Sequence, residues 1–234
     1  PFYHLNKNIL LMAKKILNKK EKIFVMINAK EIKNSKHLIR LISDKRKFID
    51  GIRFAIPPKE VENFLKILKP VQRKFIDISI NLNLMYLSTW YSNVDFSRKL
   101  INSLVGKVDT VSIVDSYGAM LPNQITNFLK FINKKKIKIG CHFHNNCGLA
   151  LANTLSALDA GCVVADSTFK GMGRGAGNAE TELMLAIKAK KSEKISGFDI
   201  SSLIGKFEIM KTKMKWGSSY AYAYAAKEGY SQNQ

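Results

Sequence analysis

Residues 137–160 read I-K-I-G-C-H-F-H-N-N-C-G-L-A-L-A-N-T-L-S-A-L-D-A, a short apolar run followed by a helical pattern. The apolar run has the composition of a buried strand, and the helical pattern covers Leu149–Ala160. Successive side chains of a strand alternate between its two faces. His142 and His144 are therefore expected on one face, about 7 Å apart along the strand, with Cys141 on the other.

The same order of strand and helix recurs along the whole chain. Strands are predicted at Lys22–Asn28, Ile49–Ile56, Phe75–Leu82, Thr110–Asp115, Ile137–His144 and Cys162–Phe169. Helices are predicted at Lys36–Ser43, Pro58–Leu68, Asp95–Val105, Pro122–Ile132, Leu149–Ala160 and Ala179–Lys190. Buried strands that each lead into a helix of about ten residues predict a parallel sheet covered by helices.

Six units of about 25 to 30 residues fit a (β/α)8 TIM barrel better than an open Rossmann sheet. A closed barrel has eight units. The sequence therefore predicts an α/β fold, a TIM barrel that lacks its first two βα units. We expect residues 1–205 to form this partial barrel domain and residues 206–234 to form a C-terminal helical extension.

Composition limits the class of protein. Of the 234 residues, 46% are hydrophobic, which is typical of a folded domain. Without an apolar run of 18 residues no membrane helix is expected. Three cysteines, an odd number confined to residues 141–162, favour reduced thiols and a cytoplasmic protein. The net charge of +20 comes mainly from lysines spread along helix faces, so we expect a solvated surface and no nucleic-acid partner.

Polar side chains end four consecutive predicted strands. They are Asn81 and Asn83, then Asp115 and Ser116, then His142 and His144, and finally Asp166. Active sites of such barrels lie at the carboxyl ends of the strands, so these side chains are candidates for one site. Ordinary turn formation is the alternative for the segment Asp115–Gly118.

The histidine pair is a candidate metal site. Two imidazoles on one face of a strand can converge on a single cation. The alternative is a pair of hydrogen-bonded polar residues. A zinc site that also uses Cys141 and Cys147 is disfavoured because Cys141 faces away from His142, and we interpret Cys141 and Cys162 as small core residues.

The loop Gly171–Asn178 reads G-M-G-R-G-A-G-N and has three interpretations. It could be a flexible turn, a dinucleotide-binding loop of the type G-x-G-x-x-A, or a backbone cradle that brings Asn178 close to a ligand. The dinucleotide interpretation is weak because residues 188–196 do not resemble the second strand that such a site needs. The cradle is favoured because loops after the last strands of a barrel commonly form its ligand site.

Several of these runs resemble one family. They are His142-Phe-His144-Asn-Asn, Gly148-Leu-Ala-Leu-Ala-Asn153, Gly171-Met-Gly173 through Gly177-Asn178, Asp115-Ser-Tyr-Gly-Ala-Met-Leu-Pro122 and Trp216-Gly-Ser-Ser-Tyr220. Together they are similar to the DRE-TIM metallolyases, which include HMG-CoA lyase and 2-isopropylmalate synthase. The similarity covers about residues 23–225 and is nearest to the 4-hydroxy-2-oxovalerate aldolase-like members.

The resemblance implies a set of site residues. His142 and His144 would be metal ligands with Asn178 in or beside the coordination shell, and the metal would be Mn²⁺ or Mg²⁺, with Zn²⁺ possible. Substrate would contact Asn81, Asp115, Ser116 and Gly173. The family's catalytic Arg and Asp, in a D-x-x-x-R-D segment, are expected upstream of residue 1, so these 234 residues alone are expected to be inactive.

The resemblance also implies an activity. We expect a metal-dependent lyase that cleaves a 4-hydroxy-2-keto acid to pyruvate and an aldehyde, the metal acting as a Lewis acid. Two alternatives remain, an acyl-CoA-condensing synthase of the isopropylmalate or citramalate type, and a catalytically incomplete barrel used as a binding module. A homo-oligomer and an aldehyde dehydrogenase partner are further expectations.

Overall fold

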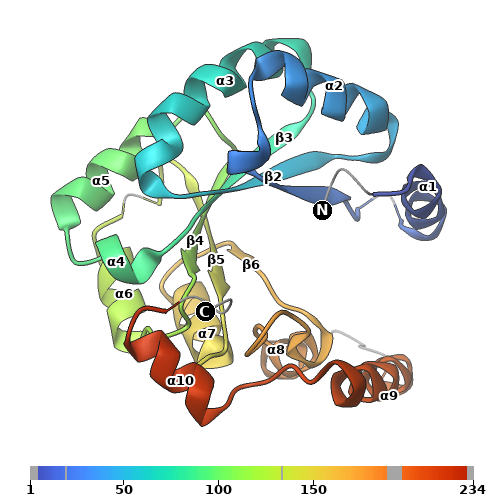
Figure 1. Ribbon diagram of the computed structural model, residues 1–234, viewed down its shortest axis with the longest axis vertical. Helices are drawn as coiled ribbons and strands as arrows, with labels where there is room; N and C mark the ends of the chain where they lie inside the picture. Colours follow the sequence, from blue (N-terminus) through green and yellow to red (C-terminus); the bar gives the residue numbers. More distant parts are fainter. Residues whose placement is uncertain (1–4, 19, 133, 189–196, 231–234) are drawn as a thin grey trace. The chain divides into compact units, whose positions relative to one another are not determined.

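The computed structural model describes residues 5–18, 20–132, 134–188 and 197–230 (Figure 1). Its strands are β1 (Phe24–Asn28), β2 (Gly51–Ile56), β3 (Ser79–Leu84), β4 (Thr110–Asp115), β5 (Lys138–Phe143) and β6 (Val164–Ala165). Its helices are α1 (Lys7–Ile16), α2 (Ser35–Lys45), α3 (Val61–Lys74), α4 (Leu87–Trp90), α5 (Val94–Ser103), α6 (Pro122–Lys130), α7 (Ala150–Asp159), α8 (Thr181–Lys188), α9 (Gly197–Met214) and α10 (Tyr220–Lys227).

The strands form one sheet in the order β1-β2-β3-β4-β5-β6, and the pairs β1–β2, β2–β3 and β5–β6 are parallel. Sequential strand order is that of a (β/α) barrel, whereas a doubly wound sheet reverses its order at a switch point. The predicted α/β class with a parallel sheet is therefore confirmed. The end of the last predicted helix, at residues 189 and 190, lies outside the described residues.

Several predicted boundaries were wrong, and the strand predicted to start at Phe75 starts at Ser79. The helix predicted to end at Leu68 continues to Lys74 through Pro70, and its first turn at Pro58 is a separate 3₁₀ turn, Pro58–Glu60. The strand predicted at Cys162–Phe169 is only two residues long, and beyond its C-terminal end the Thr168 N–H donates to Ala179 O and not to β5. The predicted boundary at residue 205 falls inside α9, and the division into barrel and extension stays a prediction.

Contacts divide the chain into two compact units, Pro1–Met85 with Leu100–Ser112, and Tyr86–Lys99 with Ile113–Gln234. In the first unit, α2 and α3 lie side by side (Figure 1). Phe64 of α3 packs on Phe54 of β2 with ring centroids 4.9 Å apart.

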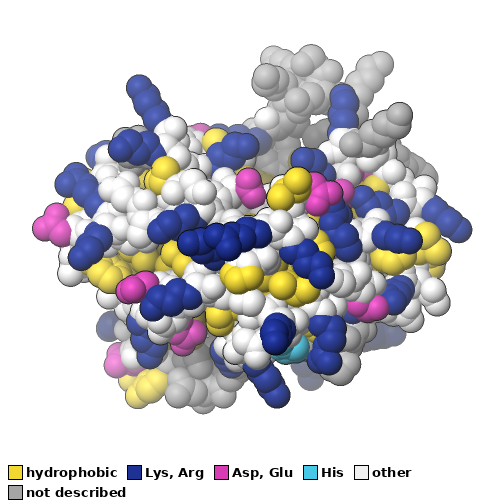
Figure 2. Space-filling model, turned by 90° about the horizontal axis from the view of Figure 1, so that it is seen from above, with side chains coloured by type: hydrophobic (Ala, Val, Ile, Leu, Met, Phe, Trp, Pro, Cys, Tyr) yellow, Lys and Arg dark blue, Asp and Glu magenta, His cyan; other side chains and the backbone are white. Residues whose placement is uncertain are grey.

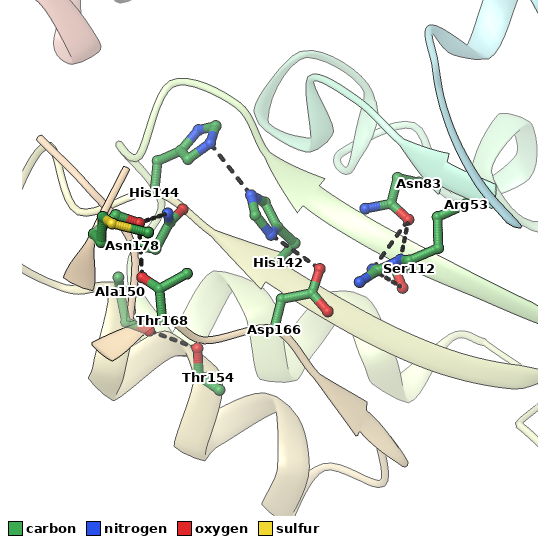
Figure 3. A network of polar contacts seen from close by, with 11 residues as sticks. Arg53, Asn83, Ser112, His142, His144, Ala150, Thr154, Asp166, Thr168 and Asn178 are labelled. Carbon is green, nitrogen blue, oxygen red and sulfur yellow. Dashed lines mark hydrogen bonds and ion pairs between the residues drawn. The ribbon is translucent and has the colours of Figure 1, made fainter. Parts of the chain in front are cut away.

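The first unit also contains a polar network that joins three strands (Figure 3). Arg53 of β2 donates through Nε and Nη2 to Asn83 Oδ1 on β3, at 3.2 and 3.1 Å, and through Nη2 to Ser112 Oγ on β4 at 3.3 Å. Asn83 and Ser112 are buried, so the guanidinium donors compensate for the loss of water at these groups.

In the second unit, β5 is buried along most of its length and leads to the candidate site. Ile139, Cys141 and Phe143 are at most 1% exposed, while His142 between them is more accessible. Helix α7 packs against β5 and β6, and Thr154 Oγ1 donates to Ala150 O inside that helix (Figure 3). Small residues on the buried face of α7, such as Ala150 and Ala157, allow a close approach to the sheet.

The surface carries many positive charges. Figure 2 shows Lys and Arg side chains spread over the visible face, with hydrophobic and acidic side chains between them. Within the part of the chain that the structure describes, no helix has the length and apolar character needed to cross a membrane.

Candidate metal centre

His142 and His144 lie at the carboxyl end of β5 with their rings together (Figure 3). The two Nε2 atoms are 3.3 Å apart, the ring centroids are 5.0 Å apart and the rings meet at 86°. Alternation along the strand therefore places both rings on one face, as the sequence predicts. Ligand nitrogens about 2.1 Å from a shared cation must lie within about 4.2 Å of each other, and this pair does.

The other ring nitrogen of each histidine has an oxygen acceptor. His142 Nδ1 lies 3.0 Å from Asp166 Oδ2, and His144 Nδ1 lies 2.9 Å from the carbonyl oxygen of Ser116. Carboxylate and carbonyl oxygens accept, so each Nδ1 carries the hydrogen. In the neutral rings, both Nε2 atoms then carry no hydrogen, and their lone pairs face each other. This arrangement needs a proton or a metal cation between them.

Burial disfavours a proton on His144. Burial, reinforced by the neighbouring His142 ring and by Arg174, lowers the pKa of His144 to about 4, although the bond to Ser116 opposes the change. At neutral pH this ring is uncharged, which is the form that binds metals. The donor chemistry of the pair thus fits a divalent cation.

Asn178 reaches the same region from the glycine loop. Its backbone forms an antiparallel bridge with His144, and its Nδ2 donates to Met172 O at 2.9 Å. Its Oδ1 is buried and has no hydrogen-bond partner among the described residues. A buried amide oxygen without a partner is costly, and coordination of a cation would satisfy it. That Asn178 shares one cation with the histidines stays a prediction.

The donor set consists of two imidazoles and an amide oxygen. Among the described residues, no cluster of three or more His, Cys, Asp and Glu side chains is arranged to hold a metal ion. The third candidate donor here is an asparagine, which lies outside those four residue types. Nitrogen and oxygen donors of this kind suit Mn²⁺ or Zn²⁺, and further oxygen donors would be needed for Mg²⁺.

Asp115 and Ser116 form the turn next to the pair. The Asp115 carboxylate is fully buried, and its two oxygens accept the N–H groups of Gly118 and Met120 at 3.1 and 2.9 Å. Burial raises the pKa of Asp115 against the effect of these two bonds. The Ser116 hydroxyl accepts the N–H of Tyr86 at 2.9 Å. The Asp115 side chain therefore stabilises the turn, and the Ser116 side chain joins the turn to Tyr86. Their contact with substrate stays a prediction.

Gly173 and Asn81 are the other predicted substrate contacts. A Cβ atom at Gly173 would lie 2.4 Å from Asn178 Nδ2, so the absence of a side chain lets the loop fold against that amide. Asn81 belongs to the first unit, where it is buried and its Oδ1 accepts from Ser79 Oγ at 3.4 Å. The predicted contact of Gly173 and Asn81 with substrate stays a prediction.

The contact of Asp166 with His142 was not predicted, although Asp166 was expected at this rim. The sequence does contain a signal for this contact. Asp166 follows β6, which pairs with β5, and the carboxyl ends of neighbouring parallel strands lie at the same edge of the sheet. Cys141 and Cys162 are buried, as expected of core residues. The Cys162 thiol and burial together raise the pKa of Cys141, so this thiol stays protonated and is a poor metal ligand.

Comparisons with known proteins indicate one family. The family model described as HMGL-like matches residues 61–211, more than half of the chain. The 4-hydroxy-2-oxovalerate aldolase of Pelotomaculum thermopropionicum is 37% identical over 108 residues, which are 46% of this chain and 32% of that protein. The enzyme of the same name from Thermomicrobium roseum is 46% identical over 83 residues, 35% of this chain and 23% of that protein. These matches span about a third or less of each relative.

Solved structures give the same fold. The N-terminal domain of a candidate aldolase from Bacteroides vulgatus has a TM-score of 0.86 at 28% identity, over 97% of this chain and 75% of that one. HMG-CoA lyase from Bacillus subtilis has a TM-score of 0.67 at 19% identity, over 94% and 80% of the two chains, which supports the fold alone. On the match over residues 61–211, the chain belongs to the HMGL-like family.

Proposed function

We propose that this chain forms part of a metal-dependent carbon–carbon lyase, an aldolase that cleaves a 4-hydroxy-2-keto acid to pyruvate and an aldehyde. One observation carries the proposal. Two Nε2 atoms lie 3.3 Å apart, and each ring is fixed through its Nδ1. Such an arrangement is that of a prepared cation site, because a single cation satisfies both lone pairs.

Each residue has a role that follows from its contacts. His142 and His144 bind the cation, and Asn178 offers its amide oxygen. Asp166 keeps the proton of His142 on Nδ1, as the Ser116 carbonyl does for His144. The bound cation supplies a Lewis acid that polarises the keto group of the substrate. The Asp115 turn holds the Ser116 carbonyl in place, and Asp115, Ser116, Gly173 and Asn81 are proposed to line the substrate site.

The choice of substrate rests on the relatives, whose shared name is 4-hydroxy-2-oxovalerate aldolase. An acyl-CoA-condensing synthase is the alternative within this family. It would use the same cation site with a different second substrate, so substrate assays separate the two. A catalytically incomplete barrel that only binds ligands is the third possibility, and it predicts cation binding without turnover.

Further properties are proposals of the same kind. Mn²⁺ or Mg²⁺ is the proposed metal, with Zn²⁺ as an alternative that the nitrogen donors also fit. A homo-oligomer and an aldehyde dehydrogenase that removes the aldehyde product are proposed partners. The three cysteines are free thiols, which supports a cytoplasmic location.

The test has two stages. Calorimetry first measures Mn²⁺ binding by the chelator-treated 234-residue chain. Pyruvate release from 4-hydroxy-2-oxovalerate is then measured with this chain and with a chain extended upstream along its coding sequence, before and after chelation. We expect turnover in the extended chain that chelator removes and Mn²⁺ restores, and none in the 234 residues alone. Pyruvate release that is insensitive to chelator would contradict the mechanism, and cation binding with no turnover in either chain would favour the binding module.

A further inference from the structure

Trp216 lies in the C-terminal segment, between α9 and α10. Its side chain packs against the glycine loop, residues 171–178. It is 5% exposed, and its Nε1–H donates to the carbonyl oxygen of Lys170 at 2.8 Å. The next residue, Gly217, donates its N–H to Gly175 O at 3.0 Å. A buried indole whose N–H is hydrogen-bonded is held in one orientation. Trp216 and Gly217 therefore bond to Lys170, just before the loop, and to Gly175, inside it.

The loop is tight where the indole touches it. Gly177 has φ +81°, and a Cβ atom there would lie 3.3 Å from Trp216 Cδ1 and 2.3 Å from Gly171 O. Only glycine fits this conformation and this space. The indole thus covers the residue that immediately precedes Asn178.

Asn178 is held by the same loop. Its N–H donates to Gly171 O at 3.0 Å, and its Nδ2 donates to Met172 O, which also accepts from Thr168 Oγ1 at 2.8 Å. The direction of the Asn178 side chain therefore depends on the carbonyl groups of residues 171 and 172. A shift of this part of the loop would redirect the buried Oδ1.

The loop is also joined directly to the histidine strand. Asn145, which follows His144, donates its N–H to Gly177 O at 2.9 Å. Gly177 therefore has the indole on one side and the end of the histidine segment on the other. Movement of the loop away from Trp216 would change the distance between Asn178 and His144.

A second set of contacts ties α9 to the start of the loop. Lys170 Nζ lies 3.2 Å from Glu208 of α9 and 3.7 Å from Glu180, and the Phe169 and Phe207 rings are 5.5 Å apart. The Lys170 N–H donates to the Glu182 carboxylate at 3.1 Å. These contacts keep the carbonyl of Lys170, the acceptor of the indole N–H, in a fixed place.

We propose that Trp216 is a positioning residue for the metal centre, which holds the glycine loop so that the Asn178 amide oxygen faces the histidine pair. This inference takes the cation from the proposed function. The contacts between Trp216 and the loop are observed independently of that function. It assigns the segment after α9 a role in metal affinity, since partners of metal ligands commonly change affinity by about 10- to 100-fold when mutated.

The experiment uses the two tryptophans of the full chain as a matched pair. Trp216→Phe keeps a buried ring but removes the N–H bond to Lys170. Trp90→Phe removes a comparable buried indole from α4, where it packs on Phe128. Mn²⁺ affinity is measured by calorimetry, and hydrogen exchange of residues 171–178 is measured by mass spectrometry in the metal-free protein.

We expect Trp216→Phe to weaken Mn²⁺ binding by about tenfold or more and to speed exchange in residues 171–178, with Trp90→Phe unchanged in both. A change in only one of the two measurements, or an equal change in both variants, would overturn the inference. If the wild-type chain binds no Mn²⁺, the proposed function fails, and the exchange comparison alone decides whether Trp216 holds the loop.

If the Trp216→Phe variant does not fold, a second measurement tests the same inference. In the Trp90→Phe variant, Trp216 is the remaining tryptophan, and it lies against the residue before Asn178. Its emission should change with Mn²⁺ at the midpoint that calorimetry gives. Mn²⁺ binding by calorimetry without any change of this emission would count against the positioning role.

Discussion

The histidine pair and the Arg53 network are both groups of polar side chains that arise from the strands, and they differ in how donors meet acceptors (Figure 3). In the network, the Arg53 donors point to the oxygens of Asn83 and Ser112. In the pair, both Nδ1 atoms have an acceptor, but the two Nε2 atoms face each other. A network in which donors meet acceptors stabilises the fold without any ligand, whereas two facing acceptors need a proton or a cation between them.

This difference gives each group a separate expected response to mutation. Changes at the histidine pair should alter cation affinity with a smaller effect on folding. Changes in the Arg53 network should alter the free energy of unfolding and leave cation affinity as it is. The predictions below test that contrast.

The largest effect is expected from His142→Ala. This change removes one of the two imidazole ligands, and a cation then has one nitrogen donor and an amide. Divalent-metal binding measured by calorimetry should be abolished. The control is His37→Ala on α2, a histidine of the other unit, which should bind Mn²⁺ like the wild type. An unchanged isotherm for His142→Ala would refute the ligand role.

A smaller effect is expected from pH on the metal-free protein. His144 has a pKa of about 4 when folded, against its ordinary value of 6.5, so between these values the unfolded chain binds more protons. The contribution of His144 to the free energy of unfolding therefore rises with pH across that window, by roughly 3 kcal/mol, and is lost as pH falls. Urea unfolding at pH 4.5 and 7 measures it. His144→Gln should reduce the difference between the two pH values, and an equal difference in both proteins would exclude the buried neutral ring.

The sequence predicts the existence and order of the strands better than the residues at which they begin and end. Apolar runs bounded by polar residues identify β4 at its observed limits and β5 to within one residue at each end. The alternation of side chains along β5 also brings the two histidines together, because it depends only on local geometry. For the same reason Cys141 is correctly placed in the core.

The remaining features depend on contacts between distant segments. Asp166 meets His142 across 24 residues of sequence, and Trp216 meets Lys170 across 46. No periodicity connects such positions. The early end of β6 has the same origin, since Thr168 bonds to Ala179 in the glycine-loop region. The sequence of the loop indicates a cradle but not which residues hold it closed.

A moderate effect is expected from Asp166→Asn. The amide is a weaker acceptor and can present its NH₂ group to His142 Nδ1, so the ring is no longer held with its proton there. Mn²⁺ affinity should fall by about 10- to 100-fold. Asp159→Asn, which removes a carboxylate at the end of α7 that pairs with Lys188, should leave the affinity unchanged. Equal affinities of wild type and Asp166→Asn would mean that Asp166 does not orient the ring.

The smallest effect is expected from Ser112→Ala in the Arg53 network. The serine hydroxyl is buried and accepts from Arg53 Nη2, so its loss removes one hydrogen bond to a charged group. The free energy of unfolding should fall by about 1 to 2 kcal/mol in urea denaturation, with Mn²⁺ affinity unchanged. Ser88→Ala is the matched control, because the Ser88 hydroxyl is buried without a hydrogen-bond partner among the described residues and its removal should cost nothing. If Ser112→Ala weakened Mn²⁺ binding as strongly as Asp166→Asn, the network would belong to the metal centre and the contrast between the two groups would fail.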